Sequence, residues 1–103
     1  TLVVCISEHG RTPRIDDSPG GGRNHWSRAY SAIFAGGGFG RGRVVGKTDA
    51  IAGDVADNPF SPNDILATVY HLLGIDHEIL LHDRLNRPLP IVAAGRVRDE
   101  LLG

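Results

Sequence analysis

Short apolar runs separated by polar, glycine-rich stretches dominate the pattern of hydrophobic positions along the chain. Residues 2–6 are continuously apolar and rich in β-branched side chains, which is typical of a parallel strand buried on both faces. A second apolar run at residues 29–35 ends at the glycine triplet 36–38 and predicts another strand. The pair of valines at residues 44–45 predicts a third, short extended segment.

The clearest helical pattern lies at residues 62–73. Its apolar side chains recur at positions i, i+1, i+4, i+7 and i+8, which is the spacing of one amphipathic face. Ser61 or Asn63 can cap the N-terminus, and Pro62 suits the first turn. Gly74 stands where a C-terminal cap belongs. The sequence therefore predicts one well-defined helix.

The C-terminal part adds two weaker elements. Two apolar stretches within residues 79–92 flank a turn-like segment at 83–88, and residues 97–102 are compatible with a short helix. Mixed strands and helices together with a parallel-type strand favour an α/β fold. Because the chain opens at Thr1 directly before a buried strand, we expect residues 1–103 to be a single segment of a larger domain whose neighbouring strands lie upstream.

Composition and charge narrow the classes of function. The 11 basic and 12 acidic residues leave a net charge of −1, which argues against nucleic-acid binding through bulk charge. The single cysteine, Cys5, excludes an internal disulfide framework and a cysteine-rich zinc module. No apolar run approaches the roughly 18 residues that a membrane span needs, so no membrane span is expected in this segment.

A long polar loop predicted at residues 7–28 holds the candidate chemistry. Loops beyond about 12–15 residues are usually functional or disordered. Glu8 and His9 directly follow the first strand, where open α/β sheets bind ligands, and His25 could return to the same sheet edge. A carboxylate with two imidazoles suits zinc, manganese or iron. The alternative is structural: Glu8 and His9 cap the start of the loop, and His25 hydrogen-bonds to the backbone.

Arginines form a second group of candidates in or beside this loop. Arg11, Arg14 and Arg23 present planar guanidinium groups that suit phosphate or sulfate oxyanions. Asp16 and Asp17 lie in the same loop, so an internally paired surface is the alternative interpretation.

Several motifs of the chain, in this order, resemble those of a known family. They are LVVCISEHGRTP at residues 2–13, GRNHW at 22–26, AGGG at 35–38, GKTD at 46–49 and DILATVYHLLGID at 64–76. Together they resemble the C-terminal part of the domain of unknown function 1501 family, a sulfatase-like family of the alkaline phosphatase superfamily. The resemblance extends over nearly the whole chain.

This resemblance implies a doubly wound α/β sandwich, incomplete in this chain, with a metal site at the strand ends. It implies metal-dependent hydrolysis of phosphate or sulfate esters by a nucleophile that lies upstream, so these residues would supply part of a site. Glu8, His9 and His25 would ligate a divalent metal, which is zinc, manganese or calcium. From the chemistry of the guanidinium group alone, and not from the resemblance, Arg11 or Arg23 would contact the non-bridging oxygens of the substrate.

Expectations for partners and location also come from the resemblance. The expected ligand is a small-molecule ester or a glycan rather than nucleic acid, and the expected location is the periplasm or the cell surface. Position 8 carries Glu where the superfamily carries Asp. This departure favours a second hypothesis, a non-catalytic binding or structural member of the same fold.

Overall fold

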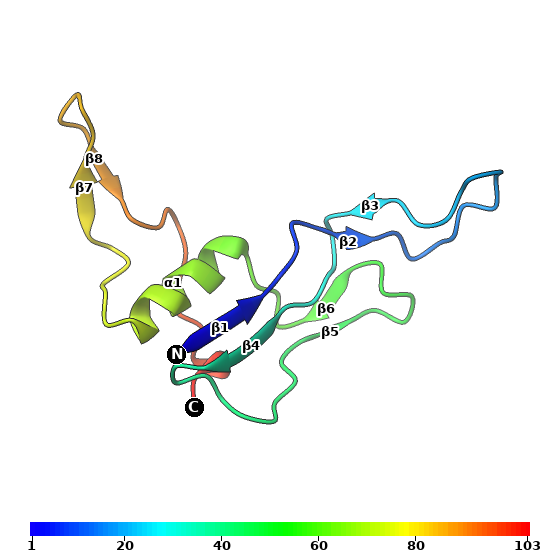
Figure 1. Ribbon diagram of the computed structural model, residues 1–103, viewed down its shortest axis with the longest axis horizontal. Helices are drawn as coiled ribbons and strands as arrows, with labels where there is room; N and C mark the ends of the chain where they lie inside the picture. Colours follow the sequence, from blue (N-terminus) through cyan, green and yellow to red (C-terminus); the bar gives the residue numbers. More distant parts are fainter. The chain divides into compact units, whose positions relative to one another are not determined.

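The strands of this chain pair two at a time, in four antiparallel ribbons, and no sheet has more than two strands. The computed structural model describes residues 1–103, and its elements group into two units (Figure 1). The first unit contains residues 1–36 and 42–59, and the second contains residues 37–41 and 60–103.

The first ribbon joins β1, Leu2–Cys5, to β4, Ile33–Gly36, in antiparallel register. Intermediate and exposed residues alternate along β1, and Val3 is 53 % exposed. The prediction of a parallel strand buried on both faces is therefore wrong for β1 in this structure. An apolar run does not specify the direction of its partner, and an antiparallel pair can leave one face open to water. β4 also begins at Ile33 rather than at residue 29.

The segment predicted as a long loop, residues 7–28, folds back on itself as a ribbon. β2, Gly10–Arg11, pairs antiparallel with β3, His25–Trp26 (Figure 1). Toward the tip, Asp16 and Gly22 exchange backbone hydrogen bonds of 2.7 and 2.9 Å. The sequence does not reveal this pairing, because its partners are far apart in the chain and the strands are too short to show a period of two.

The first unit is completed by β5, Lys47–Thr48, and β6, Val55–Asp57, which pair antiparallel. The indole Nε1 of Trp26 donates a hydrogen bond of 2.7 Å to the carbonyl oxygen of Gly53 in the connecting loop, which ties this loop to β3. The extended segment predicted at residues 44–45 is not a strand, because no other segment pairs with it and Val44 is almost fully exposed.

The second unit is built on α1, Pro62–Leu72. The Ser61 hydroxyl accepts a hydrogen bond from the Asp64 N–H at 3.1 Å, and the Asp64 carboxylate accepts one from the Ser61 N–H at 3.1 Å. This reciprocal arrangement is a capping box. Gly74 follows the helix with φ of 77°, a conformation that glycine adopts without strain. The predicted helix is confirmed, and Ser61 rather than Asn63 is its cap.

A second hairpin follows α1. β7, Leu80–His82, pairs antiparallel with β8, Pro88–Pro90, on either side of the predicted turn. The apolar stretches predicted around that turn therefore correspond to strands.

The chain ends in a single 3-10 turn, Asp99–Leu101, rather than in the helix predicted at residues 97–102. The backbone N–H of Arg98 donates a hydrogen bond of 2.9 Å to the Thr68 hydroxyl, and Arg98 is extended, with φ of −104° and ψ of 97°. A residue held in this conformation cannot belong to a helix, so helical backbone begins only after it.

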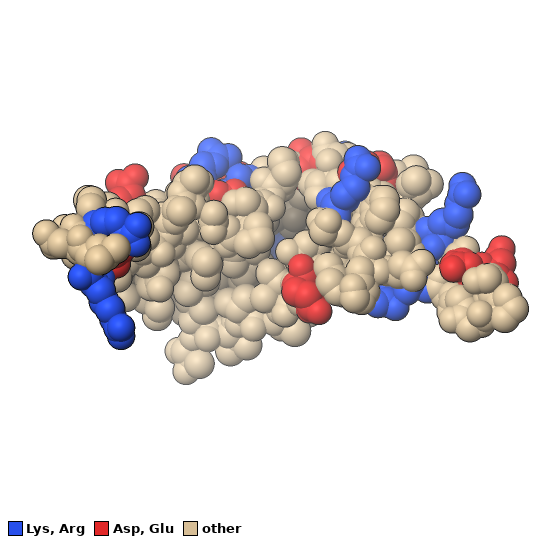
Figure 2. Space-filling model, turned by 90° about the horizontal axis from the view of Figure 1, so that it is seen from above, with Lys and Arg blue, Asp and Glu red and all other residues tan.

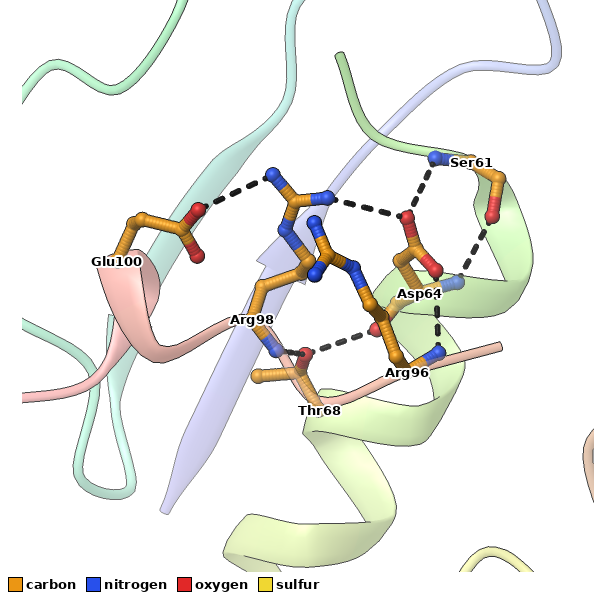
Figure 3. A network of polar contacts seen from close by, with 6 residues as sticks. All are labelled: Ser61, Asp64, Thr68, Arg96, Arg98 and Glu100. Atoms are coloured by element: carbon orange, nitrogen blue, oxygen red, sulfur yellow. Dashed lines mark hydrogen bonds and ion pairs between the residues drawn. The ribbon is translucent and has the colours of Figure 1, made fainter. Parts of the chain in front are cut away.

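Figure 3 shows the polar network around Arg98. The Arg98 side chain is only 4 % exposed, and its guanidinium group lies 3.5 Å from the Asp64 carboxylate and 3.1 Å from the Glu100 carboxylate. It also lies 4.4 Å from the centre of the Phe60 ring, within cation–π range. Thr68, which is fully buried, donates its hydroxyl proton to the Asp64 carbonyl oxygen at 2.8 Å. The network ties the C-terminal segment to the first turns of α1.

Burial and hydrogen bonding shift the pKa of Asp64 in opposite directions. Burial raises the pKa of its carboxyl group, but backbone hydrogen bonds from Ser61 and Arg96 lower that pKa. The Ser61 hydroxyl and the positive charge of Arg98 lower it further, so the pKa of Asp64 lies below its ordinary value of 3.8. The ionised form is therefore the one that the network stabilises.

Charged side chains of both signs are interspersed on the face of the molecule drawn in Figure 2. This agrees with the net charge of −1. None of the helices is long and apolar enough to cross a membrane.

Candidate functional site

The ribbon β2–β3 brings together the three residues that the sequence identifies as candidate metal ligands. Arg11 pairs opposite His25, so His9, which directly precedes β2, comes to lie beside His25. The two imidazole rings are stacked, with centroids 3.8 Å apart and planes inclined by 27°. The Glu8 Oε1 atom lies 3.3 Å from His9 Nε2. Antiparallel pairing within one ribbon, rather than the shared edge of a parallel sheet, brings these side chains together.

Both ring nitrogens of His9 face acceptors. Nδ1 lies 3.0 Å from the carbonyl oxygen of Gly10, and Nε2 faces the Glu8 carboxylate. The His9 side chain is 22 % exposed, whereas that of Glu8 is 80 % exposed. Glycine is required at position 10, the first residue of β2, because a Cβ atom there would collide with the backbone oxygen of Ala29. An imidazolium ring can donate to both acceptors at once, and a neutral ring can donate to only one.

The two histidines act electrostatically on Glu8. The pKa of Glu8 is lowered from its ordinary value of 4.5, first by a hydrogen bond from its own backbone N–H and then by the charges of His9 and His25. Because Glu8 is exposed, water and salt screen these interactions, and they add little to stability. The carboxylate of the cluster is thus exposed to solvent, whereas the His9 ring beside it is half-buried.

As arranged, these residues do not fit a metal site. A histidine ligand binds the metal through one ring nitrogen and donates the N–H of the other nitrogen to an acceptor, whereas both nitrogens of His9 face acceptors. The two imidazole rings lie one above the other, with centroids 3.8 Å apart and planes inclined by 27°. No group of three or more His, Cys, Asp or Glu side chains in the structure could hold a metal ion. The geometry fits a hydrogen-bonded cluster instead.

The two arginines expected to contact substrate help to hold the ribbon together. Arg11 Nη2 donates a hydrogen bond to the carbonyl oxygen of Arg23. Arg23 Nη1 donates to the carbonyl oxygens of Thr12 and Pro13, at 2.6 and 2.9 Å. Both arginines are exposed, so their other N–H groups face solvent. Each guanidinium group therefore stabilises the ribbon and still offers donors on its outer side.

Arg28 lies two residues after β3 and contacts both Asp54 and Trp26. The sequence does not predict these contacts. The Nε and Nη2 atoms of Arg28 form a two-pronged ion pair with the Asp54 carboxylate, at 2.6 and 2.9 Å. Its guanidinium carbon lies 5.7 Å from the centre of the Trp26 ring. No local signal could have revealed this pair, because its partners are 26 residues apart.

Comparison with known proteins gives a family but no relative of known activity. Residues 1–102 match the family model described as "Protein of unknown function (DUF1501)". No curated protein and no solved structure matches this chain. Because the family match extends over almost the entire chain, this protein belongs to the DUF1501 family.

Proposed function

We propose that this chain is part of a hydrolase of phosphate or sulfate esters, to which it contributes Glu8, His9 and His25. One observation carries the proposal: a carboxylate and two stacked imidazoles from both sides of the ribbon form one solvent-open cluster. The class of ester is supported by the resemblance of the motifs to sulfatases and phosphatases. The resemblance implies an α/β sandwich of which this chain is only one part. The nucleophile would lie in the upstream part of that sandwich, outside these residues.

Proton transfer is the chemistry that this cluster can perform. Cleavage of an ester leaves an alkoxide oxygen, which must gain a proton as the bond to phosphorus or sulfur breaks. His9 would supply this proton, and the Glu8 carboxylate, 3.3 Å from its Nε2 atom, would stabilise the imidazolium beforehand. His25 would hold the plane of the donor ring by stacking.

A leaving-group series on the full-length protein tests this role. A general acid contributes about 10²–10⁴-fold to the rate, and its contribution is largest when the leaving group is a poor one. We therefore expect His9→Gln to slow hydrolysis of an alkyl phosphate or sulfate by at least about 100-fold, and that of the p-nitrophenyl ester much less. His71→Gln, at an exposed helical position, is the matched control and should leave both rates unchanged. Equal loss on both esters would argue against proton donation.

The metal-dependent form of this hypothesis has its own test. Mass-spectrometric metal analysis of the full-length protein and of its His25→Ala variant would show whether these residues bind zinc, manganese or calcium. The stacked arrangement predicts that any bound metal is retained in the variant. Loss of a stoichiometric metal in His25→Ala would instead assign ligand roles to the cluster and require the two rings to separate.

The second candidate function is a non-catalytic binding or structural member of the same fold. It is supported by Arg11 and Arg23, whose guanidinium groups hydrogen-bond to backbone carbonyls of the ribbon. A full-length protein that cleaves neither ester, yet binds inorganic phosphate or sulfate through these arginines, would favour this candidate.

The remaining parts of the proposal are supported by the family resemblance alone. They are a small-molecule ester or a glycan as the ligand, and the periplasm or the cell surface as the location.

A further inference from the structure

We propose that Asp49 is a positioning residue for the stacked imidazoles of His9 and His25. The inference rests on the proposed function, because this stacking is what would hold the donor ring in place during ester cleavage. It gives a role to two sequence motifs that the cluster itself leaves without one. They are GKTD at residues 46–49, which ends in Asp49, and GRNHW at 22–26, which ends in a tryptophan.

The Asp49 carboxylate closes the turn that joins β5 to β6. Its Oδ1 atom accepts a hydrogen bond of 2.7 Å from the Gly53 N–H, and its Oδ2 atom accepts one of 3.2 Å from the Asp54 N–H. The Asp49 N–H also donates to the Asp54 carbonyl oxygen at 2.9 Å, and the Asp49 carbonyl oxygen accepts from the Ala52 N–H at 3.2 Å. Gly53 is buried, so without this carboxylate its N–H would lose its partner.

One peptide group of this turn is held from both sides. The Asp54 N–H, which donates to Asp49, belongs to the same peptide group as the Gly53 carbonyl. The oxygen of that carbonyl accepts the indole N–H of Trp26 at 2.7 Å. A peptide group is planar, and in the trans form its N–H and C=O point in opposite directions. The hydrogen bond from the N–H to Asp49 therefore fixes the direction in which the carbonyl oxygen meets the indole.

The Asp54 side chain adds a second link between this turn and the chain after β3. Its carboxylate accepts hydrogen bonds of 2.6 and 2.9 Å from Arg28, and the Arg28 guanidinium group lies 5.7 Å from the centre of the Trp26 ring. The two residues that donate their N–H groups to Asp49 are therefore the same two that hold Trp26 and Arg28. A single carboxylate organises both links.

These links reach the imidazoles through the backbone of β3. His25 directly precedes Trp26, and neighbouring strand residues project to opposite faces of a ribbon. The His25 ring forms no hydrogen bond of its own within the chain, so its place against His9 depends on the backbone of β3 and on the stacking contact. Anchoring the indole on one face therefore fixes where the imidazole lies on the other.

In the proposed reaction this positioning acts on the chemical step. A misplacement of about 1 Å can cost about 100-fold in rate. Asp49→Ala in the full-length protein should therefore lower kcat for the alkyl ester by about 10- to 100-fold and leave KM within about twofold. Hydrolysis of the p-nitrophenyl ester should fall less, as expected for His9→Gln. The matched control is Asp57→Ala, at an exposed position of β6 whose side chain forms no hydrogen bond or ion pair, and its rates should be unchanged.

Imidazole chemical shifts test the positioning itself, independently of hydrolysis. Asp49→Ala in the full-length protein should move the ring signals of His9 and His25, whereas Asp57→Ala should not. Asp49→Asn keeps an oxygen for the Gly53 N–H but not for the Asp54 N–H, so it should move the signals in the same direction and less far. Unchanged signals in Asp49→Ala and Asp49→Asn would overturn the proposal. If the wild type cleaves neither ester and the signals still move as expected, the proposed function fails and the role of Asp49 stands.

A double variant tests the route from Asp49 to the imidazoles. Trp26→Phe keeps an aromatic ring but removes the N–H that bonds to Gly53, and should move the same signals. Because both changes break one series of contacts, adding Trp26→Phe to Asp49→Ala should move the signals no further than Asp49→Ala alone. Circular dichroism checks that each variant folds. Displacements that add up in the double variant would show that Asp49 does not act through Trp26 and would overturn the proposal.

Discussion

Two polar clusters made of similar residue types behave in opposite ways in this molecule. In the first unit, Glu8, His9 and His25 lie on an exposed ribbon, and the Glu8 side chain is 80 % exposed. In the second unit, Asp64 and Arg98 are enclosed, and the Arg98 side chain is 4 % exposed. A carboxylate and a basic residue are present in both clusters, so residue type alone does not determine whether a cluster is exposed or enclosed.

What separates the two clusters is how far their hydrogen-bonding capacity is used within the chain. Both carboxylate oxygens of Asp64 are engaged, one by the Arg96 N–H and the other by the Ser61 N–H and the Arg98 guanidinium group. The Glu8 carboxylate has His9 as its only side-chain partner within ion-pair distance and, apart from a hydrogen bond from its own backbone N–H, is exposed. The enclosed cluster therefore stabilises the fold, whereas the exposed cluster, which we propose as part of a site, leaves its carboxylate open to solvent.

The largest expected effect is on stability, and it compares the two carboxylates directly. Asp64→Ala removes the capping box and leaves the buried Arg98 without this partner, so we expect the free energy of unfolding to fall by about 3 kcal/mol. Hydrogen exchange of the α1 amides and urea unfolding measure the loss. Glu8→Ala is the matched control and should leave stability unchanged within error. Equal losses in the two variants would contradict the distinction between the clusters.

A smaller effect is expected at Gly10, the first residue of β2, which directly follows His9. Gly10→Ala introduces a Cβ atom where the backbone oxygen of Ala29 lies, so the chain must shift, at a cost of about 2 kcal/mol. That shift should separate the rings of His9 and His25, and their imidazole chemical shifts would report it. Ser27→Ala, an exposed position in the same unit, is the control. Unchanged imidazole shifts in Gly10→Ala would show that the close approach of Gly10 to Ala29 does not set the stacking.

The smallest expected effect is the response of the second unit to acid. The pKa of Asp64 is lowered in the fold, so its ionised form contributes stability that is fully present well above pH 3.8 and lost as the pH falls through the folded-state pKa. The loss is smaller than in Asp64→Ala, because a protonated carboxyl group still accepts hydrogen bonds. Protection factors of the α1 amides, which correct exchange rates for the intrinsic pH dependence of exchange, should fall below pH 4 in the wild type and change less with pH in Asp64→Asn. The same pH dependence in both proteins would assign it to another group.

The helix was the part of the fold that the sequence predicted best. Its amphipathic spacing, the Ser61 cap and Gly74 all lie within one continuous segment, residues 61–74, and helix formation depends mainly on such local signals. The strands were predicted less well. The run at residues 2–6 marks an extended segment, but nothing local in it indicates that β1 pairs antiparallel with β4.

The candidate site was likewise predicted only in part from the sequence. The sequence by itself determined which chemical groups are present in the polar segment: Glu8 and His9 beside a strand, and His25 at the far end. Only the tertiary structure decided that the imidazoles stack and that both nitrogens of His9 face acceptors. It also decided that Arg98, hydrogen-bonded to Thr68, is extended rather than helical. The physical reason is the range of the interactions. Capping and amphipathic periodicity act over a few residues, whereas strand pairing and buried ion pairs join residues whose separation in the chain carries no local signal.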